Sequence, residues 1–141
     1  MLRKAKTSDV KLIHRIINLS AAKGEMLPRS LVDLYNSLRD FYVYMEEDGG
    51  PIVGVVAMHL FWENLAEIRS LYVVDEYRKK GIGKKLVEAC ISEAITLEIY
   101  RIFALTYQKE FFARMGFHEV QRTELPEKIW SDCFKCWKYP D

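Results

Sequence analysis

Cysteine is scarce in this chain of 141 residues, neither charge sign is in excess, and no long apolar run is present. Three cysteines are too few, and odd in number, for a disulfide scaffold, which favours a reducing compartment. The 21 basic and 20 acidic residues leave a net charge of +1, which gives no support for a globally basic nucleic-acid binder. No apolar run approaches the roughly 20 residues that span a bilayer.

The start of the chain lacks a secretory signal, because residues 1–6 lead into Thr7, Ser8 and Asp9 instead of an apolar core. We therefore expect a cytoplasmic protein with no membrane partner. The length fits one domain over residues 1–141, which is long enough to bury a core without disulfides or metals.

Hydrophobic patterning predicts an alternation of strands and helices. Strands are expected over residues 2–5, 41–45, 52–62, 67–74 and 101–106 and from 116 onward, with helices between 9 and 24, after 30, over 83–94 and over 109–115. Consecutive strands joined by short turns should be antiparallel, whereas the strand–helix–strand unit over 67–106 should pair in parallel. The fold class is therefore α/β in the α+β sense, with a mixed, mostly antiparallel central sheet and flanking helices.

A basic segment with two glycines follows the strand at 67–74. Residues 78–85 hold five cations in eight positions, and Gly81 and Gly83 stand where the chain turns into a helix. Backbone N–H groups at a helix N-terminus bind anions, and glycine lets a phosphate approach the backbone closely. The alternative is a solvated helix start, but cations there oppose the helix dipole at about 0.3–1 kcal/mol each. The segment therefore predicts a polyphosphate site.

Two common phosphate motifs do not fit this segment. A P-loop requires G-x-x-x-x-G-K-[S/T], and neither its first glycine nor its hydroxyl is present. A dinucleotide fingerprint requires a third glycine, and Leu86 occupies that position. These two classes are therefore excluded.

The run from Leu71 to Gly83, with R-x-x-G-x-G beginning at Arg78, resembles the acetyl-CoA signature of the GNAT superfamily of N-acetyltransferases. Residues 111–117, which end in Gly-Phe, resemble that superfamily's second motif. The resemblance implies the acyl-CoA N-acyltransferase fold and acetyl-CoA as co-substrate, with no metal. It also implies a set of cofactor-binding positions, namely Leu71, Tyr72, Val73, Arg78, Lys79, Lys80, Gly81, Ile82, Gly83, Lys84 and Phe112.

The same resemblance implies how these positions act. The backbone from Arg78 to Lys84 would hold the CoA pyrophosphate, and the backbone at Leu71 and Val73 would pair with the pantetheine arm. An amide near Leu71 would polarise the thioester carbonyl, which makes Leu71 a catalytic position through its backbone.

Four segments are similar to the acetyltransferase domain of N-acetylglutamate synthases, and most of all to the short, stand-alone bacterial form. They cover residues 27–30, 65–71, 103–106 and 125–133. This resemblance implies L-glutamate as the acceptor, acetylated on its α-amino group, and a place in arginine biosynthesis. It further implies a substrate pocket that includes Leu27, with Arg29 gripping a carboxylate and Lys135 as a candidate second cation.

Glu67 is the candidate general base, since it lies in the strand that runs toward the acetyl site. The alternative is a surface carboxylate paired with Arg69, and the resemblance to the synthases favours the base. A glutamate has a pKa near 4.3 and an α-amino group near 8 in model peptides, so direct proton transfer is uphill. Either burial raises the pKa of the glutamate, or the proton moves through a relay water.

The general acid departs from the superfamily pattern. Phe112 stands where many members carry a tyrosine that protonates the leaving thiolate, and Gln108, beside Tyr107, stands near the serine of the larger synthases. A thiol has a pKa of roughly 8.5 and needs little help to leave, so the reaction itself is still expected.

The remaining chemistry-bearing residues favour structural roles. His14, His59 and His118 have no metal-ligand spacing, and Cys90 falls on the apolar face of a helix. Cys133 and Cys136 form one C-x-x-C pair, which is half a zinc site, a redox pair or two buried thiols, and no metal is expected.

The expected partner is a small-molecule amine, L-glutamate in the first place, and a homodimer is compatible with the sequence. Two rivals stay open. One is the same fold acting on another amino acid, a polyamine or a protein N-terminus, and the other is a module that senses acetyl-CoA without catalysis.

Overall fold

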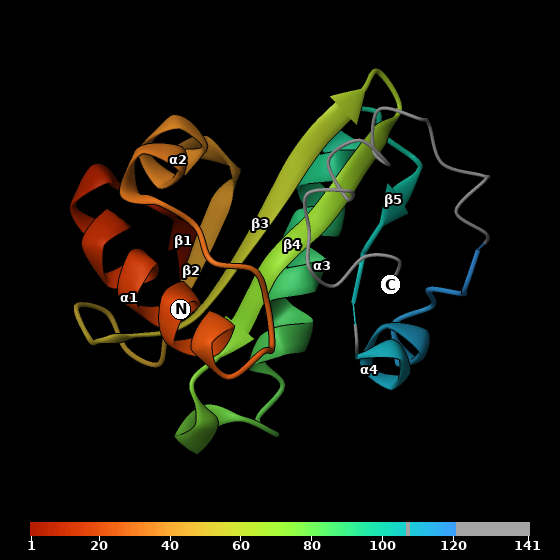
Figure 1. Cartoon of the computed structure of the whole chain (residues 1–141). Coiled ribbons are helices and arrows are strands. Elements are labelled where there is room, and N and C mark those ends of the chain that lie inside the picture. The colour runs from red at the N-terminus through yellow and green to blue at the C-terminus, as the bar shows by residue number, and fades with distance from the viewer. Residues whose placement is uncertain (107, 121–141) are drawn as a thin grey trace. The chain divides into compact units, whose positions relative to one another are not determined.

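The computed structural model describes residues 1–106 and 108–120, and the chain divides into two compact units, Met1–Ala104 and Leu105–Asp141 (Figure 1). The first unit holds a five-stranded sheet with three helices. The second holds one described helix, α4 (Lys109–Arg114). The single-domain organisation expected from length stays a prediction.

The sheet of the first unit has the strand order β1-β2-β3-β4-β5. Its strands are β1 (Leu2–Lys4), β2 (Phe41–Met45), β3 (Ile52–Trp62), β4 (Leu65–Val73) and β5 (Ile102–Phe103). The first four pair antiparallel in sequence order, and β5 pairs with β4 in parallel. The predicted class, a mixed and mostly antiparallel sheet flanked by helices, is confirmed.

Helices α1 (Val10–Ala22), α2 (Leu31–Asn36) and α3 (Ile82–Thr96) flank the sheet (Figure 1). The start of α2 has a local cause, because the Ser30 hydroxyl accepts a hydrogen bond from the Asp33 N–H at 3.1 Å. This capping serine directly follows Arg29, so it fixes the backbone on which one candidate site residue stands.

The two faces of β3 show how the helices are placed. Val55 and Ala57 belong to one buried cluster with Ile13 and Ile17 of α1 and Leu34 of α2. Gly54 faces the other way, since a Cβ there would meet Leu86 at 3.0 Å and Ile82 at 3.2 Å. Neighbouring strand residues point to opposite faces, so α1 and α2 cover one face of β3 and α3 packs on the other.

A β-bulge interrupts β4 at Ser70. Val55 pairs with Tyr72 and Ala57 with Arg69, so Val56 opposes two residues of β4, Ser70 and Leu71. Ser70 has a φ of +56°, in the left-handed region that a residue with a side chain adopts at a cost. Bulges of this kind re-aim the side chains that follow them, and they are common beside active sites.

Several predicted boundaries differ from the structure. The expected strand at 101–106 pairs only over Ile102–Phe103, and residues 116–120 form no strand. The run at 52–62 is covered on both faces only as far as Met58, after which burial alternates. The strand expected at 67–74 begins earlier, at Leu65, because residues 63 and 64 alone make the turn from β3.

The carboxylate of Asp9 should make the free energy of unfolding of the first unit decrease at acid pH. Its buried carboxylate accepts hydrogen bonds from Arg3 Nη1 and Nη2, at 2.7 and 3.1 Å, and from the Lys6 N–H, at 2.7 Å. The bond from Arg3 is the largest cause that holds the pKa of Asp9 below its usual value. We expect Asp9→Asn to cost about 1.5–3 kcal/mol at pH 7, as for hydrogen bonds to charged groups.

The pH window follows from the lowered pKa. The stabilisation is complete above the unfolded-state pKa of about 3.9 and disappears as the pH falls through the lower folded-state pKa. Urea unfolding at several pH values should therefore show the difference between wild type and Asp9→Asn shrinking progressively as the pH falls below about 3.9, with the exposed Glu88→Gln as control. A difference that persists unchanged at low pH would assign the effect to packing instead.

Candidate active site

The site is built where β4 leaves its neighbour β5. The parallel pairing covers only Ala66 with Ile102 and Glu67 with Phe103. Beyond Glu67, within residues 1–106 and 108–120, no strand pairs with the outer edge of β4. The bulge at Ser70 lies in this open stretch. Leu71, Tyr72 and Val73 follow it, each half-buried, so the positions predicted for the pantetheine arm lie on an unpaired strand edge.

The loop after β4 is braced by the side chain of Arg78. Its Nε donates to the Val73 carbonyl at 2.9 Å, its Nη1 lies 3.3 Å from Asp75 Oδ1, and its guanidinium lies 5.1 Å from the centre of the Tyr72 ring. These contacts turn the side chain back toward β4. Its backbone N–H donates to the Asp75 carbonyl at 3.2 Å, so a role of Arg78 toward a phosphate stays a prediction from the resemblance.

The rest of the loop leaves its backbone accessible at the start of α3. Gly81 has a φ of +80°, and a Cβ built on it would meet nothing within 4 Å. The side chain of Ile82 is buried in the core, while those of Lys79 and Lys84 are exposed. Lys80 lies 3.4 Å from Glu46 Oε1. The first N–H groups of a helix have no partner within it, so this end offers donors to a phosphate.

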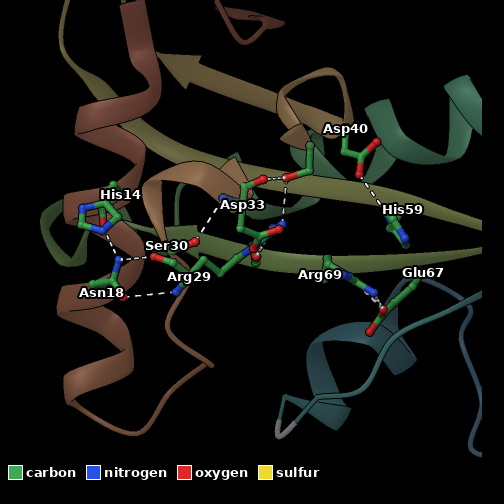
Figure 2. Close-up of polar contacts among 11 residues, drawn as sticks. His14, Asn18, Arg29, Ser30, Asp33, Asp40, His59, Glu67 and Arg69 are labelled. Carbon is green, nitrogen blue, oxygen red and sulfur yellow. Dashed lines mark hydrogen bonds and ion pairs between the residues drawn. The ribbon is translucent and has the colours of Figure 1, made fainter. Parts of the chain in front are cut away.

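Glu67 is buried, with 6% of its surface exposed, although it is a carboxylate. Arg69 donates to its Oε1 from both Nε, at 2.9 Å, and Nη2. The pairing with Arg69 that sequence reasoning weighed therefore exists, but the carboxylate is not a surface group. His59 faces Glu67 across the β3–β4 ladder (Figure 2). Phe103 of β5 is the partner of Glu67 on the other side of β4.

Arg29 is one of the most constrained charged groups of the first unit. Its side chain is 10% exposed and donates to Asp33 Oδ2 at 2.7 Å, to Ser37 Oγ at 2.8 Å and to Ser70 Oγ at 3.4 Å (Figure 2). Its guanidinium lies 5.3 Å from the centre of the Phe41 ring. The side chain of a solvated loop residue would be exposed and would lack these hydrogen bonds, so Arg29 is not such a residue.

The partners of Arg29 also fix its backbone and its charge environment. Asn18 of α1 receives the Arg29 N–H on Oδ1 at 3.2 Å and donates to its carbonyl at 3.0 Å. The hydrogen bond from Arg29 holds the pKa of Asp33 below its usual value, against the effect of burial. Leu27 lies on the same loop and is partly exposed.

The second unit carries the second motif. Phe112 of α4 packs edge-on against Phe111 and against Phe117, with ring centres 5.1 Å apart in each pair. The backbone N–H of Gln108 donates to Thr106 Oγ1 at 2.8 Å. Tyr107, Cys133, Lys135 and Cys136 lie outside the described residues.

Two residues of the site, Ser70 and His59, have no signal of their own in the sequence. Asp33 is foreshadowed by its i, i+4 spacing from Arg29, but Ser70 lies 41 residues away from Arg29. His59, expected as an ordinary structural histidine, has its Nδ1 3.0 Å from Asp40 Oδ2 and its ring edge-on to Phe61. The contacts of Ser70 with Arg29 and of His59 with Asp40 do not follow from local sequence.

Three further observations concern a metal site, a cysteine nucleophile and a membrane-spanning helix. Among residues 1–106 and 108–120, no three His, Cys, Asp or Glu side chains cluster as a metal site would require. Burial raises the pKa of the Cys90 thiol to about 12, so it is not a nucleophile at neutral pH. In the same part of the chain, no helix is long and apolar enough to cross a membrane.

The model of the acetyltransferase (GNAT) family matches residues 13–117 of the chain. The chain therefore belongs to the GNAT family and is an acetyl-CoA-dependent N-acetyltransferase, which confirms the superfamily resemblance. It is 40% identical over 139 residues to an uncharacterized N-acetyltransferase of Chlorobaculum tepidum, covering 97% of this chain and 87% of that protein.

Further relatives are amino-acid acetyltransferases. That of Mycobacterium tuberculosis is 35% identical over 133 residues, covering 94% of this chain and 76% of that protein. The solved N-acetylglutamate synthase of Neisseria gonorrhoeae, complexed with coenzyme A and N-acetyl-glutamate, is 30% identical with a TM-score of 0.91. The match covers 99% of this chain and 33% of the synthase, so the chain spans a third of that enzyme.

Proposed function

We propose that the protein transfers the acetyl group of acetyl-CoA to the α-amino group of L-glutamate by direct attack in a ternary complex, and so serves arginine biosynthesis. One observation carries this proposal. A buried carboxylate, Glu67, and the guanidinium of Arg29, whose side chain is 10% exposed, lie beside the bulge of β4, on the stretch whose outer edge is unpaired after Glu67.

Each group then has a role that its surroundings support. Glu67 takes a proton from the α-ammonium group, directly or through a water, so that the neutral amine attacks the thioester carbonyl; this is the task of a general base. The amide near Leu71 polarises the thioester carbonyl, and Arg29 binds an acceptor carboxylate. Both reactants are bound at once in this proposal, and Cys90, the one cysteine of the described residues, is a buried thiol that does not carry the acetyl group.

The cofactor occupies the positions implied by the resemblance. The pantetheine arm adds to the β4 edge at Leu71, Tyr72 and Val73, and the pyrophosphate lies on the backbone of residues 78–84. For Phe112 a cofactor contact, and for Leu27 and Lys135 a role in acceptor binding, rest on the resemblance alone.

Two comparisons support glutamate as the acceptor. The synthase that matches with a TM-score of 0.91 was solved with N-acetyl-glutamate, the product expected here. The relative from Mycobacterium tuberculosis, of which this chain covers 76%, is an amino-acid acetyltransferase. The rivals are another amine acceptor and acetyl-CoA sensing without turnover.

Thiol release from acetyl-CoA, measured with a panel of amines, separates the three. The panel contains L-glutamate, L-glutamine, L-aspartate, spermidine and a peptide with a free N-terminus. We expect the highest kcat/KM with L-glutamate. A higher kcat/KM with the polyamine or the peptide would show that the acceptor is not glutamate. Tight binding of acetyl-CoA without release of thiol would favour the sensing module.

Arg29→Lys should raise the KM for L-glutamate by about 10–100-fold and leave the KM for acetyl-CoA unchanged. A guanidinium binds a carboxylate with two parallel hydrogen bonds, which a lysine cannot imitate. The measurement is initial rate against glutamate at saturating acetyl-CoA. Arg15→Lys, at an exposed position of α1, is the control. If the folded Arg29→Lys variant has the wild-type KM for glutamate, Arg29 does not bind the acceptor carboxylate.

A further inference from the structure

The bulge of β4 gathers three polar side chains on one face of the sheet. Arg69 pairs with Ala57, which belongs to the cluster under α1 and α2, so Arg69 and its i−2 neighbour Glu67 lie on that face. Ser70 would point away in a regular strand, yet its hydroxyl lies 3.4 Å from Arg29 Nη1. On this face Arg69 therefore bonds Glu67 (Figure 2), and Arg29 reaches Ser70 of the same bulge.

The guanidinium of Arg69 is used on one edge only. Its Nε and Nη2 both donate to Glu67 Oε1, and its face lies 5.5 Å from the centre of the Phe61 ring. An arginine has five N–H donors arranged in two edges. The remaining edge, formed by Nη1 and Nη2, meets no acceptor among residues 1–106 and 108–120, and the side chain is 29% exposed.

Arg29 is occupied more fully. Its Nε, Nη1 and Nη2 each donate to a protein oxygen, and its side chain is only 10% exposed. It keeps one hydrogen on each terminal nitrogen for a ligand. The two guanidiniums can therefore take two separate carboxylates, with Arg69 the more accessible of them.

The other charges on this face are already paired. Asp33 lies 2.7 Å from Arg29, and Asp40 lies 3.0 Å from His59. Coulombic effects of Arg69 and His59 add to the bond from Arg29 in lowering the pKa of Asp33, which places both side chains within electrostatic reach of it. No anion of the described residues other than Glu67 is in hydrogen-bond contact with Arg69.

We propose that Arg69 is the specificity-determining residue of the acceptor site, and that its outer edge binds the side-chain carboxylate of a dicarboxylic amino acid while its inner edge holds Glu67. This inference rests on the proposed function. Arg29 then binds the α-carboxylate of the acceptor, and Arg69 binds its side-chain carboxylate. The general base, Glu67, is hydrogen-bonded to the same Arg69.

The test compares L-glutamate with L-glutamine, which has the same shape but a neutral side chain. Removing Arg69 disturbs Glu67 for every acceptor, so the informative quantity is the ratio of the two kcat/KM values. Wild type should prefer glutamate, and Arg69→Gln should lower that ratio by about 10–100-fold, the usual scale for a charged, bidentate hydrogen-bond pair. Arg15→Gln is the matched control on an exposed surface, and its ratio should stay at the wild-type value.

Arg69→Lys provides a second variant that keeps the charge without the fork, and its ratio should fall to an intermediate value. Calorimetry with acetyl-CoA shows which variants are folded. If wild type acetylates glutamate and a folded Arg69 variant keeps the wild-type ratio, the inference is overturned while the proposed function stands. A wild-type enzyme that accepts no α-amino acid would overturn the proposed function itself.

Discussion

Glu67→Gln should lower kcat with L-glutamate by roughly 10²–10⁴-fold, the scale on which general bases contribute, and leave acetyl-CoA affinity unchanged. The substitution keeps the shape of a side chain that is 6% exposed and keeps an oxygen for Arg69. It removes the group that accepts the ammonium proton. Folding should survive, because a neutral amide in this buried place carries a smaller desolvation cost than a carboxylate.

The measurement is a full pH profile of kcat, with acetyl-CoA affinity taken from calorimetry on the same samples. Glu63→Gln, at the exposed turn between β3 and β4, is the control and should retain wild-type turnover. If the Glu67→Gln enzyme turns over within a few-fold of wild type up to alkaline pH, the proton leaves by another route.

Gly81→Glu should abolish detectable CoA binding while the protein stays folded. Gly81 has a φ of +80° at the start of α3, and the space that a Cβ would enter is open. A carboxylate there would point from the helix N-terminus into the position proposed for the pyrophosphate. It would meet the phosphates with like charge and occupy the donors that they need.

Two controls separate charge from backbone strain. Gly81→Gln has the same shape and the same strained φ as Gly81→Glu, which costs about 1–2 kcal/mol of stability, but it carries no charge. Gly81→Asn introduces a residue that tolerates the left-handed conformation. Calorimetry should rank CoA affinity in the order wild type, Asn, Gln, Glu. Wild-type affinity in a folded Gly81→Glu protein would place the pyrophosphate elsewhere.

Local periodicity predicts the parts of the fold that are locally determined. The strand at Phe41–Met45 alternates buried and half-buried residues along its whole length, and its predicted bounds agree with the structure. The strand expected at 101–106 is apolar enough to pair, but it pairs only where β4 is in reach, over Ile102–Phe103. Pairing partners are a tertiary property, so no local pattern predicts where such a strand ends.

The bulge shows the same limit. A glycine or an asparagine in the sequence would indicate a residue with left-handed backbone conformation. In the bulge of β4, the residue with this conformation is Ser70. The sequence therefore does not predict that Ser70 joins Arg69 and Glu67 on one face. Without the bulge, the next residue to face α1 and α2 after Arg69 would be Leu71.

The sequence also predicts some parts of the candidate site and not others. The loop at 78–84 is predicted from sequence, because glycines and cations at a strand-to-helix junction have a chemical meaning of their own. The partners of Arg29 are not, because Ser37 and Ser70 reach it from different elements. Burial of Glu67 depends on β3, β4 and β5 together, so sequence reasoning could name the residue but not its environment.

The most direct test of the central proposal counts both products of one reaction. The enzyme is incubated with acetyl-CoA and L-glutamate, free CoA is titrated as thiol, and N-acetyl-L-glutamate is quantified by mass spectrometry. We expect one N-acetyl-L-glutamate for each CoA released, with neither product formed by Glu67→Gln above about 1% of the wild-type rate. CoA release without N-acetyl-L-glutamate, or acetylation of another amine in preference to glutamate, would contradict the proposal.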